Sequence, residues 1–529
     1  MIWVDREVKK IKERKLKIEW VDDMKTPSGR IHVGSLRGVV IHDLIYKVLK
    51  ENGVNAKFSY VFNDHDPMDS IPSYLDYSKW EKYAGMPLYK VPSPEPGFKS
   101  FAEYYAKDFI EVFNSINCHP KIIWSSELYN SGKMNDVIRK ILDNSPKIRE
   151  IYYRIAKAAK ADDWFPINVV CENCGRVGTT EVYKWDGKLV YYRCSPHAVA
   201  WAKGCGHEGK ISPFNGNGKL PWKVDWGATW KTIGITIEGA GKDHMSKGGS
   251  HNITSAICQE VLDYHVPYPI PYEWFTIGGR KMSSSKGVGN SAKEVSKILP
   301  PNVFRFLIVR TPINTHLDFN PYGETILNLF DDYDRCLNAH FLKLENRIPL
   351  GKQGEVTEDF ARIIELSSVL PLTKKRLFIA RFRTVANLFK NKSTNILKFF
   401  EDQKKSKLTS AEKEILDERI NYAKIYLEKY AQDKIQTVNK TGGNFELNAN
   451  QKEFLKILAK ELSTLKQPTR ENIQEIVFQI LKTNKFSAKE VFAGFYQVFL
   501  GQNYGPKAAD LILETGLEKA LERIKLRKS

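Results

Sequence analysis

Two short segments combine glycine with side chains that can bind phosphate groups. The first reads TPSGRIHVGS over residues 26–35, between a strand-like run and a helix-like run. A triphosphate binds well at such a place, because the free N–H groups and the dipole of a helix N-terminus favour anions. Gly29 and Gly34 would let a nucleotide approach the backbone closely. His32 could donate a hydrogen bond to a phosphate under attack. Alone, the segment is equally compatible with an ordinary strand-to-helix turn.

The second segment reads GGRKMSSSKG over residues 278–287 and also follows a strand-like run. It joins a glycine-rich loop to three hydroxyl groups and the ammonium groups of Lys281 and Lys286. Such a loop can close on a leaving pyrophosphate and neutralise its charge in the transition state. A solvated serine- and lysine-rich linker is the alternative for this segment alone. The pair is more specific than either part, because the order and the preceding strands are those of a nucleotide-binding α/β fold.

Four of the seven cysteines are clustered in the sequence. Cys171 and Cys174 have the CxxC spacing that places two thiolates on one tight turn around a tetrahedral zinc ion. Cys194 and Cys205 follow at intervals that suit a zinc ribbon. The residues that could replace one of these last two ligands are His197 and His207. Four ligands leave no open coordination position, so the sequence predicts a structural zinc, with free buried cysteines as the alternative.

The elements that must position these segments begin with a strand–helix–strand unit. Alternating residues at 16–21 predict a strand, and a second apolar run at 58–62 predicts another. Between them, apolar residues from 36 to 49 recur at spacings of three and four, and Gly53 stands where a helix should end. Such a unit predicts parallel strands. Strand-like runs return at 232–237 and 273–277, after a long irregular stretch that reads as an insertion.

The bulk composition points to a soluble protein with a polyanionic partner. Apolar residues make up 42% and charged residues 27%, and no apolar run approaches the ~20 residues of a membrane span. The N-terminus lacks the apolar core of a signal peptide, so we expect a cytoplasmic protein without membrane attachment. The net charge of +19 favours a nucleic acid partner, with a lysine-rich proteome as the alternative. The sequence leaves the oligomeric state open, the monomer being the simpler expectation.

The two glycine-containing segments resemble the signature sequences of class I aminoacyl-tRNA synthetases. Residues 32–35 (HVGS) match the HIGH motif and residues 281–285 (KMSSS) match the KMSKS motif. Ser35 replaces the final histidine of the first motif. Ser284 replaces the second lysine of the other, whose charge Lys286 could supply. The resemblance implies a doubly wound, Rossmann-type fold that activates an amino acid with ATP and Mg²⁺.

Further blocks look like class I lysyl-tRNA synthetases. They read TPSGRIHVGSLRG, NDHDPMD, PWKVDW, GAGKDH and KMSSSKG. A tail segment, FLGQNYGPK, is similar to one of lysyl and glutamyl enzymes, with Gln502 in place of its usual lysine. The resemblance implies lysine, ATP and tRNA(Lys) as partners. The implied domains are the first half of the catalytic domain at 1–70, a zinc-ribbon insertion contacting the acceptor stem at 71–220, the second catalytic half at 221–325 and an all-helical anticodon-binding domain at 326–529.

A lysine pocket needs carboxylates for ammonium groups and aromatic surface for the aliphatic stem. Acidic and aromatic residues near strand ends meet this need, with Trp226 and Trp274 as further aromatic surface. The candidate lysine ligands are Asp64, Asp66, Trp222, Asp225, Asp243, His244 and Tyr272. The candidate ATP-binding residues are Pro27, Gly29, His32, Gly34, Ser35, Lys281, Met282, Ser283, Ser284 and Ser285, of which His32 and Lys281, together with Lys286, are the expected catalytic residues. The alternative is that the tryptophans are core and the aspartates cap helices.

The expected reaction has two steps, formation of lysyl-adenylate and transfer of lysine to a ribose hydroxyl of the terminal tRNA adenosine. The resemblance implies the 2′-hydroxyl. A synthetase for glutamate or cysteine is one alternative, although a glutamate pocket would need arginines. A catalytically inactive tRNA-binding protein is another, which the departures at Ser35 and Ser284 keep open.

Overall fold

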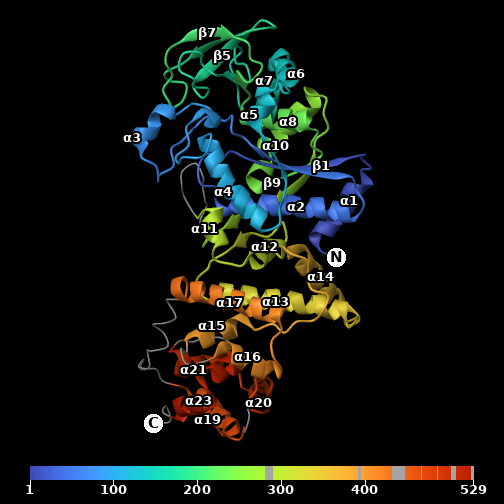
Figure 1. Cartoon of the computed structure of the whole chain (residues 1–529), viewed down its shortest axis with the longest axis vertical. Coiled ribbons are helices and arrows are strands. Elements are labelled where there is room, and N and C mark those ends of the chain that lie inside the picture. Colours follow the sequence, from blue (N-terminus) through green and yellow to red (C-terminus); the bar gives the residue numbers. More distant parts are fainter. Residues whose placement is uncertain are drawn as a thin grey trace. The chain divides into compact units, whose positions relative to one another are not determined.

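A computed structural model describes the chain except for a few short segments (Figure 1). The described residues are 1–279, 290–390, 395–431, 447–465, 468–484, 486–501 and 508–525. They form two compact units, one of residues 1–320 with 327–377 and one of residues 321–326 with 378–529. Each unit is described by itself.

The first unit is built on a parallel five-stranded sheet. Its strands are β1 (Glu19–Lys25), β2 (Ala56–Phe62), β3 (Lys121–Trp124), β9 (Ile237–Gly241) and β10 (Tyr268–Tyr272). They lie in the order β10-β9-β1-β2-β3, and all four pairs are parallel. The chain therefore winds outward from β1 in one direction and returns to β9 on its other side. This confirms the predicted doubly wound fold and places its switch point between β1 and β9, where such sheets bind ligands.

Helices cover both faces of this sheet (Figure 1). On one face, α2 (Leu36–Glu51) packs against β1, β2 and β9, and α12 (Pro301–Val309) packs on α2. On the other, α8 (Trp222–Ile233) and α10 (Ser250–Glu260) pack together over β9. The strand and helix predicted at 58–62 and 36–49 are confirmed. Gly53 follows the end of α2 with a positive φ of 73°, as predicted for a helix stop.

Two strand predictions were wrong in part. Residues 232–237 include the last turn of α8, which Gly234 ends with a φ of 90°, and β9 begins only at Ile237. Their β-branched residues favour a strand locally, but packing of α8 overrides this preference. The run at 273–277 contributes only the short β11 (Phe275–Thr276), which pairs with β12 (Leu317–Asp318) outside the main sheet.

The true edge strand, β10, was missed because it contains Pro269 and Pro271. Proline disrupts a central strand, but an edge strand tolerates it where the missing N–H would face away from the sheet. The stretch between β2 and β9 also holds part of the main sheet, since α4 (Phe101–Ser115) leads into β3. The helices α5 (Ser125–Asn130), α6 (Asn135–Asp143) and α7 (Ser145–Ala156) follow β3.

A small antiparallel module follows α7. It consists of the pair β4 (Asn168–Val169) and β8 (Gly218–Lys219) and the three-stranded sheet β5 (Thr180–Trp185), β6 (Val190–Cys194) and β7 (Glu208–Ile211). Because β4 and β8 pair with each other, the module leaves and returns at one place. The roles predicted for the four sequence segments stay predictions.

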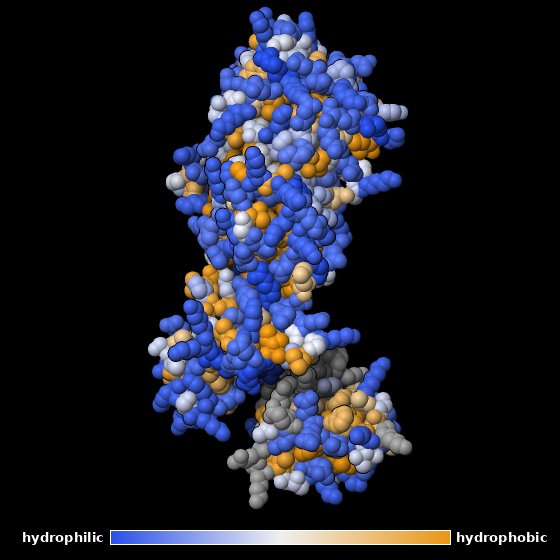
Figure 2. All heavy atoms as spheres, turned by 90° about the vertical axis from the view of Figure 1, so that its right-hand side faces the viewer, coloured by the Kyte–Doolittle hydropathy of each residue, from blue (hydrophilic) through white to orange (hydrophobic). Residues whose placement is uncertain are grey.

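Every described element of residues 378–525 is a helix. These helices are α15 (Phe382–Lys390), α16 (Ile396–Lys404), α17 (Ser410–Lys429), α19 (Ala449–Ser463), α20 (Arg470–Thr483), α21 (Ala488–Leu500), α22 (Ala508–Thr515) and α23 (Leu517–Lys525). Capping boxes at Thr409, Asn448 and Thr469 start three of them. Two further helices, α13 (Thr325–Leu344) and α14 (Lys352–Ser367), belong mostly to the first unit. Among the helices of the described segments, none has the length and apolar character to cross a membrane. Hydrophilic side chains accordingly prevail on the face in Figure 2.

Candidate active site

A pocket opens at the carboxyl ends of β1 and β9, at the switch point of the sheet. Its walls come from the ends of these strands, from η1 (Val33–Ser35), from α8 and from the chain around β10 and β11. The charged and aromatic side chains among its lining residues are Asp23, Lys25, His32, Tyr60, Trp222, Trp226, Glu238, Asp243, His244, Tyr272, Glu273, Trp274 and Phe275.

The first glycine-containing segment forms the wall next to the N-terminus of α2. His32 precedes η1, which leads directly into α2. A Cβ atom on Gly34 would lie 2.8 Å from the carbonyl oxygen of Phe275 and 2.9 Å from His32 Nδ1, so only glycine fits there. Burial, with a smaller effect from Lys25, lowers the pKa of His32 to about 3. His32 is therefore neutral near pH 7 and can act as a hydrogen-bond donor.

The described residues that flank the second segment on both sides contact the first segment. On one side, the N–H of Val33 donates to the carbonyl of Asn290 at 3.1 Å, and the N–H of Ala292 donates to the carbonyl of Ile31 at 2.9 Å. On the other, β11 lies against Gly34. The structure thus brings the chain on both sides of the second motif to the first motif, although the two are far apart in sequence. The motif residues Lys281, Met282, Ser283, Ser284, Ser285 and Lys286 lie outside the described residues.

Three of the five predicted ATP-binding residues before α2 line the pocket, namely His32, Gly34 and Ser35. Pro27 and Gly29 are buried in the preceding turn and do not line it. Their predicted role remains a prediction.

Four of the predicted lysine ligands also line the pocket: Trp222, Asp243, His244 and Tyr272. The indoles of Trp222 and Trp226 are stacked, with ring centroids 4.9 Å apart, and the His244 ring lies 5.7 Å from that of Trp222. This aromatic wall can cover an aliphatic stem and attract a cation.

The other three predicted lysine ligands lie elsewhere and are already occupied. Asp225 and Asp66 hold the ammonium of Lys219 at 2.8 Å and 3.0 Å, and the hydroxyl of Tyr129 donates to Asp225. Lys219 is only 4% exposed; burial opposes its charge, but Asp225 and Asp66 together raise the pKa of its ammonium. We call Lys219, Asp66, Asp225 and Tyr129 the Lys219 cluster.

Asp64 is likewise satisfied within the protein. It accepts hydrogen bonds from the Ser126 N–H at 2.8 Å and from the hydroxyls of Ser125 and Ser126 at 3.1 Å and 2.5 Å. It does not line the pocket.

Two buried carboxyl groups that the sequence reasoning missed do line the pocket, Asp23 and Glu238. Burial raises the pKa of Asp23 and holds that of Glu238 well above its usual range. The partners that hydrogen-bond to them are neutral. The N–H of Met24 donates to Asp23 at 2.9 Å, and the indoles of Trp226 and Trp230 donate to Glu238. Both carboxyls lie at strand ends beside the switch point, where α/β sheets bind ligands. Finding them from the sequence would have required knowledge of the strand order.

The pocket floor is fixed by close packing of α2. A Cβ on Gly38 would lie 2.6 Å from Asp23 Oδ2 and 2.7 Å from the Tyr272 hydroxyl, so both groups lie close against Gly38. His42 links the same helix to β9, because its Nε2 accepts the N–H of Gly239 at 2.7 Å while its Nδ1 lies 2.7 Å from the carbonyl of Gly38.

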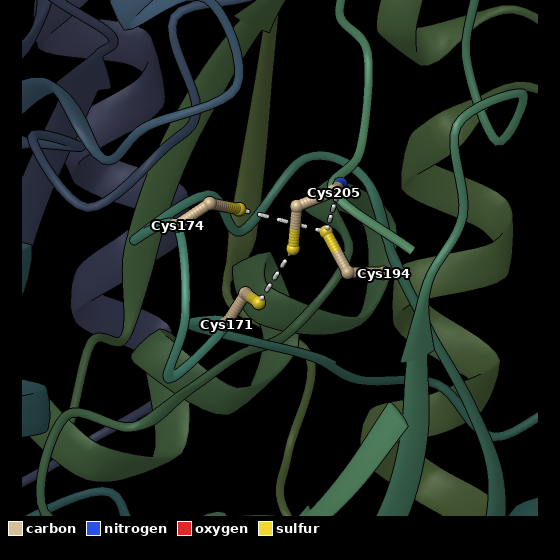
Figure 3. Close-up of side chains that lie close together, drawn as sticks. All are labelled: Cys171, Cys174, Cys194 and Cys205. Atoms are coloured by element: carbon tan, nitrogen blue, oxygen red, sulfur yellow. Dashed lines mark hydrogen bonds between the residues drawn. The ribbon is translucent and has the colours of Figure 1, made fainter. Parts of the chain in front are cut away.

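The four clustered cysteines converge in the antiparallel module (Figure 3). Cys171 Sγ lies 3.6 Å from Cys205 Sγ, Cys174 Sγ lies 3.7 Å from Cys194 Sγ, and all four sulfurs lie within 4.8 Å of one another. A tetrahedral site with metal–sulfur bonds of ~2.3 Å has sulfurs about 3.8 Å apart. The four cysteines therefore could hold a metal ion, and neither candidate histidine, His197 or His207, belongs to this group of described residues.

Comparison with known proteins decides the family. The profile described as "tRNA synthetases class I (K)" matches residues 1–370, and an anticodon binding domain profile matches residues 366–527. The chain belongs to the class I lysyl-tRNA synthetases. Relatives in this family extend over the whole chain. Proteins named lysine–tRNA ligase from Methanocaldococcus jannaschii and Methanococcus maripaludis are 32% and 31% identical to it, covering 99% of this chain and 100% of each relative. A third, from Thermoplasma volcanium, is 30% identical over 99% of both chains.

Family membership confirms the resemblance read from the glycine-containing segments and the shorter blocks. The geometry above places the individual residues in the pocket.

Proposed function

We propose that this lysine–tRNA ligase activates L-lysine with ATP in the switch-point pocket and transfers it to the 3′-terminal adenosine of tRNA(Lys). The observation that carries the proposal is one pocket that combines a helix N-terminus behind His32 with two buried carboxyls and a tryptophan wall. An acidic, aromatic pocket suits a cationic amino acid, whereas the glutamate alternative would need arginines.

The lysine side chain would lie along Trp222 and Trp226, with its ammonium groups bound by Asp23 and Glu238. These two carboxyls replace the earlier candidates Asp64, Asp66 and Asp225, whose oxygens are taken by other groups of the protein. An ammonium between buried carboxylates gains strong charge-assisted hydrogen bonds. Tyr272, Asp243 and His244 would close the pocket around it.

In the first step a carboxylate oxygen of lysine attacks the α-phosphorus of ATP. The bond from that phosphorus to the bridging oxygen breaks, and pyrophosphate leaves with the electron pair. Neutral His32 and the N-terminus of α2 would stabilise the developing charge. Lys281 and Lys286 would neutralise the leaving group, and bound Mg²⁺ would supply further positive charge. In the second step a ribose hydroxyl attacks the adenylate carbonyl, losing its proton as AMP leaves.

The metal site would hold a structural zinc ion, since four thiolates satisfy its tetrahedral coordination. The antiparallel module around it would contact the acceptor stem. The helical unit would bind the anticodon, consistent with the matching profile and with the chain's net charge of +19.

ATP–pyrophosphate exchange tests the proposal, measured with each standard amino acid, with and without tRNA(Lys). We expect exchange with lysine alone. Exchange with another amino acid would keep the fold and discard the lysine pocket. No exchange in any condition, despite tight tRNA binding, would favour the inactive tRNA-binding alternative.

A further inference from the structure

The pocket that receives a cationic amino acid contains a lysine of its own. Lys25 is the last residue of β1 and lines the pocket with a partly buried side chain. Its backbone is fixed, since it pairs with Phe62 of β2 and its carbonyl accepts the N–H of Asn63 at 3.0 Å. The side chain therefore has a defined starting point at the switch point of the sheet.

Among the described residues, the Lys25 ammonium has no hydrogen-bond or ion-pair partner. Burial lowers the pKa of this ammonium, and Asp23 offsets only part of that effect. Other lysines near the pocket are satisfied. Lys242 pairs with Glu273 at 2.7 Å and lies over the Trp274 ring, and Lys219 has two carboxylates. Lys25 differs from both in lining the pocket without an ion pair or hydrogen bond to its ammonium among the described residues.

An unpaired cation would repel both ammonium groups of bound lysine. The arrangement suits the substrate only if the anionic end of the amino acid comes to Lys25. Lys25 lines the same pocket as His32 and His244, and its charge helps to lower the pKa of both imidazoles.

We propose that Lys25 is a catalytic residue that binds the carboxylate of the substrate lysine and so directs this carboxylate toward the α-phosphate of ATP. The inference rests on the proposed function and adds to it the orientation of the amino acid. Asp23 and Glu238 attract the ammonium groups, while Lys25 repels the ε-ammonium from the reacting end. No proton moves to or from Lys25, since the attacking oxygen is already ionised. The α-phosphate is the other anion that the same ammonium could bind.

Equilibrium binding separates these possibilities without relying on turnover. The ligands are L-lysine, lysinol, which carries a hydroxymethyl group in place of the carboxylate, and ATP. The variants are Lys25→Met and Lys25→Arg, with Lys17→Met as a matched control, because Lys17 is exposed and precedes β1. Calorimetric titration of the full chain gives the Kd of each ligand.

For Lys25→Met we expect lysine to bind about 10- to 100-fold more weakly, the usual worth of a charge-assisted hydrogen bond. Lysinol should bind as well as to the wild type or better, and ATP should bind unchanged. Lys25→Arg should recover part of the lysine affinity, and Lys17→Met should match the wild type. Unchanged lysinol binding also shows that the Met variant is folded.

Three results would overturn the inference. They are unchanged lysine affinity in Lys25→Met, an equal loss for lysine and lysinol, or a loss confined to ATP, which would assign Lys25 to the α-phosphate. Failure of the proposed function gives a different pattern, in which the wild type does not support lysine-dependent exchange whatever the binding results are.

Discussion

The first unit contains two groups of acidic and aromatic side chains that differ in what they bind. In the Lys219 cluster, two carboxylates hold an ammonium of the protein itself. In the pocket, the described residues that hydrogen-bond to Asp23 and Glu238 are a backbone N–H and two indoles, while His42 Nδ1 lies 3.7 Å from Asp23 Oδ2. The carboxylates of the first group face a cation of the protein, although burial and the charge of Asp66 still raise the pKa of Asp225. In the second group, the raised pKa values are ones that a bound cation would lower. The difference shows why residue type alone does not identify a lysine site.

The largest expected effect comes from removing the ammonium of the Lys219 cluster. Lys219→Met leaves the buried Asp225 and the partly exposed Asp66 without their cation, which should lower the free energy of unfolding by about 3–5 kcal/mol. Denaturant unfolding measures this change. Lys210→Met is a control, because Lys210 is an exposed lysine on β7 of the same module. Equal unfolding of Lys219→Met and the wild type would mean that the cluster is not a stabilising ion pair.

The pocket should respond in activity. Asp23→Asn keeps the shape and the acceptor for the Met24 N–H but removes the charge, so kcat/KM for lysine should fall roughly 100-fold. Steady-state ATP–pyrophosphate exchange measures this fall, with KM for ATP as an internal control. Asp225→Asn is the matched variant. It should lower the free energy of unfolding while changing the KM for lysine little. If Asp225→Asn instead abolishes lysine use and Asp23→Asn does not, the two groups have been assigned the wrong way round.

The two groups also mark the limit of prediction from sequence. The doubly wound fold, the helix behind the first motif and the four-cysteine metal site were all predictable, because each depends on local pattern or fixed spacing. The pairing of Lys219 with Asp66 was not, since it joins residues distant in sequence. The same reasoning that chose Asp64 and Asp66 at the end of β2 applies equally to Asp23 at the end of β1.

Strand order decides between such candidates. The pocket lies between β1 and β9 because the strand order reverses there, and β10, whose prolines hide it as a strand, continues the sheet beyond β9. The carboxyls at the end of β2 lie one strand away from the switch point. A single sequence carries no direct signal for the order of the strands in the sheet.

The dependence of lysine KM on pH should sharpen the comparison. The pKa values of Asp23 and Glu238 are raised in the free protein, and a bound ammonium favours their ionised forms. Lysine affinity should therefore be full above the raised pKa values and be lost as pH falls through them, by up to about tenfold per pH unit for each carboxyl. Exchange kinetics across pH test this, and Asp23→Asn should flatten the profile.

The Lys219 cluster should respond at the other end of the pH scale. The pKa of Lys219 is raised in the folded state by Asp225 and Asp66, so the stability it contributes is present at neutral pH and lost only as pH rises through the raised value.

A lysine KM that stays constant on acidification would contradict the assignment of the two pocket carboxyls.

The smallest effect tests whether the two groups are independent. Tyr129→Phe removes the hydroxyl that donates to Asp225 and accepts the Leu220 N–H at 3.2 Å. The free energy of unfolding should fall by about 1 kcal/mol, since Lys219 still holds Asp225. The KM for lysine should stay unchanged, because neither Tyr129 nor Asp225 lines the pocket. In the double variant with Asp23→Asn, the two changes in the free energy of unfolding should add to within about 0.5 kcal/mol, as they do for separate sites. A larger departure would mean that the Lys219 cluster shapes the lysine pocket through α8, which carries Asp225 next to Trp226.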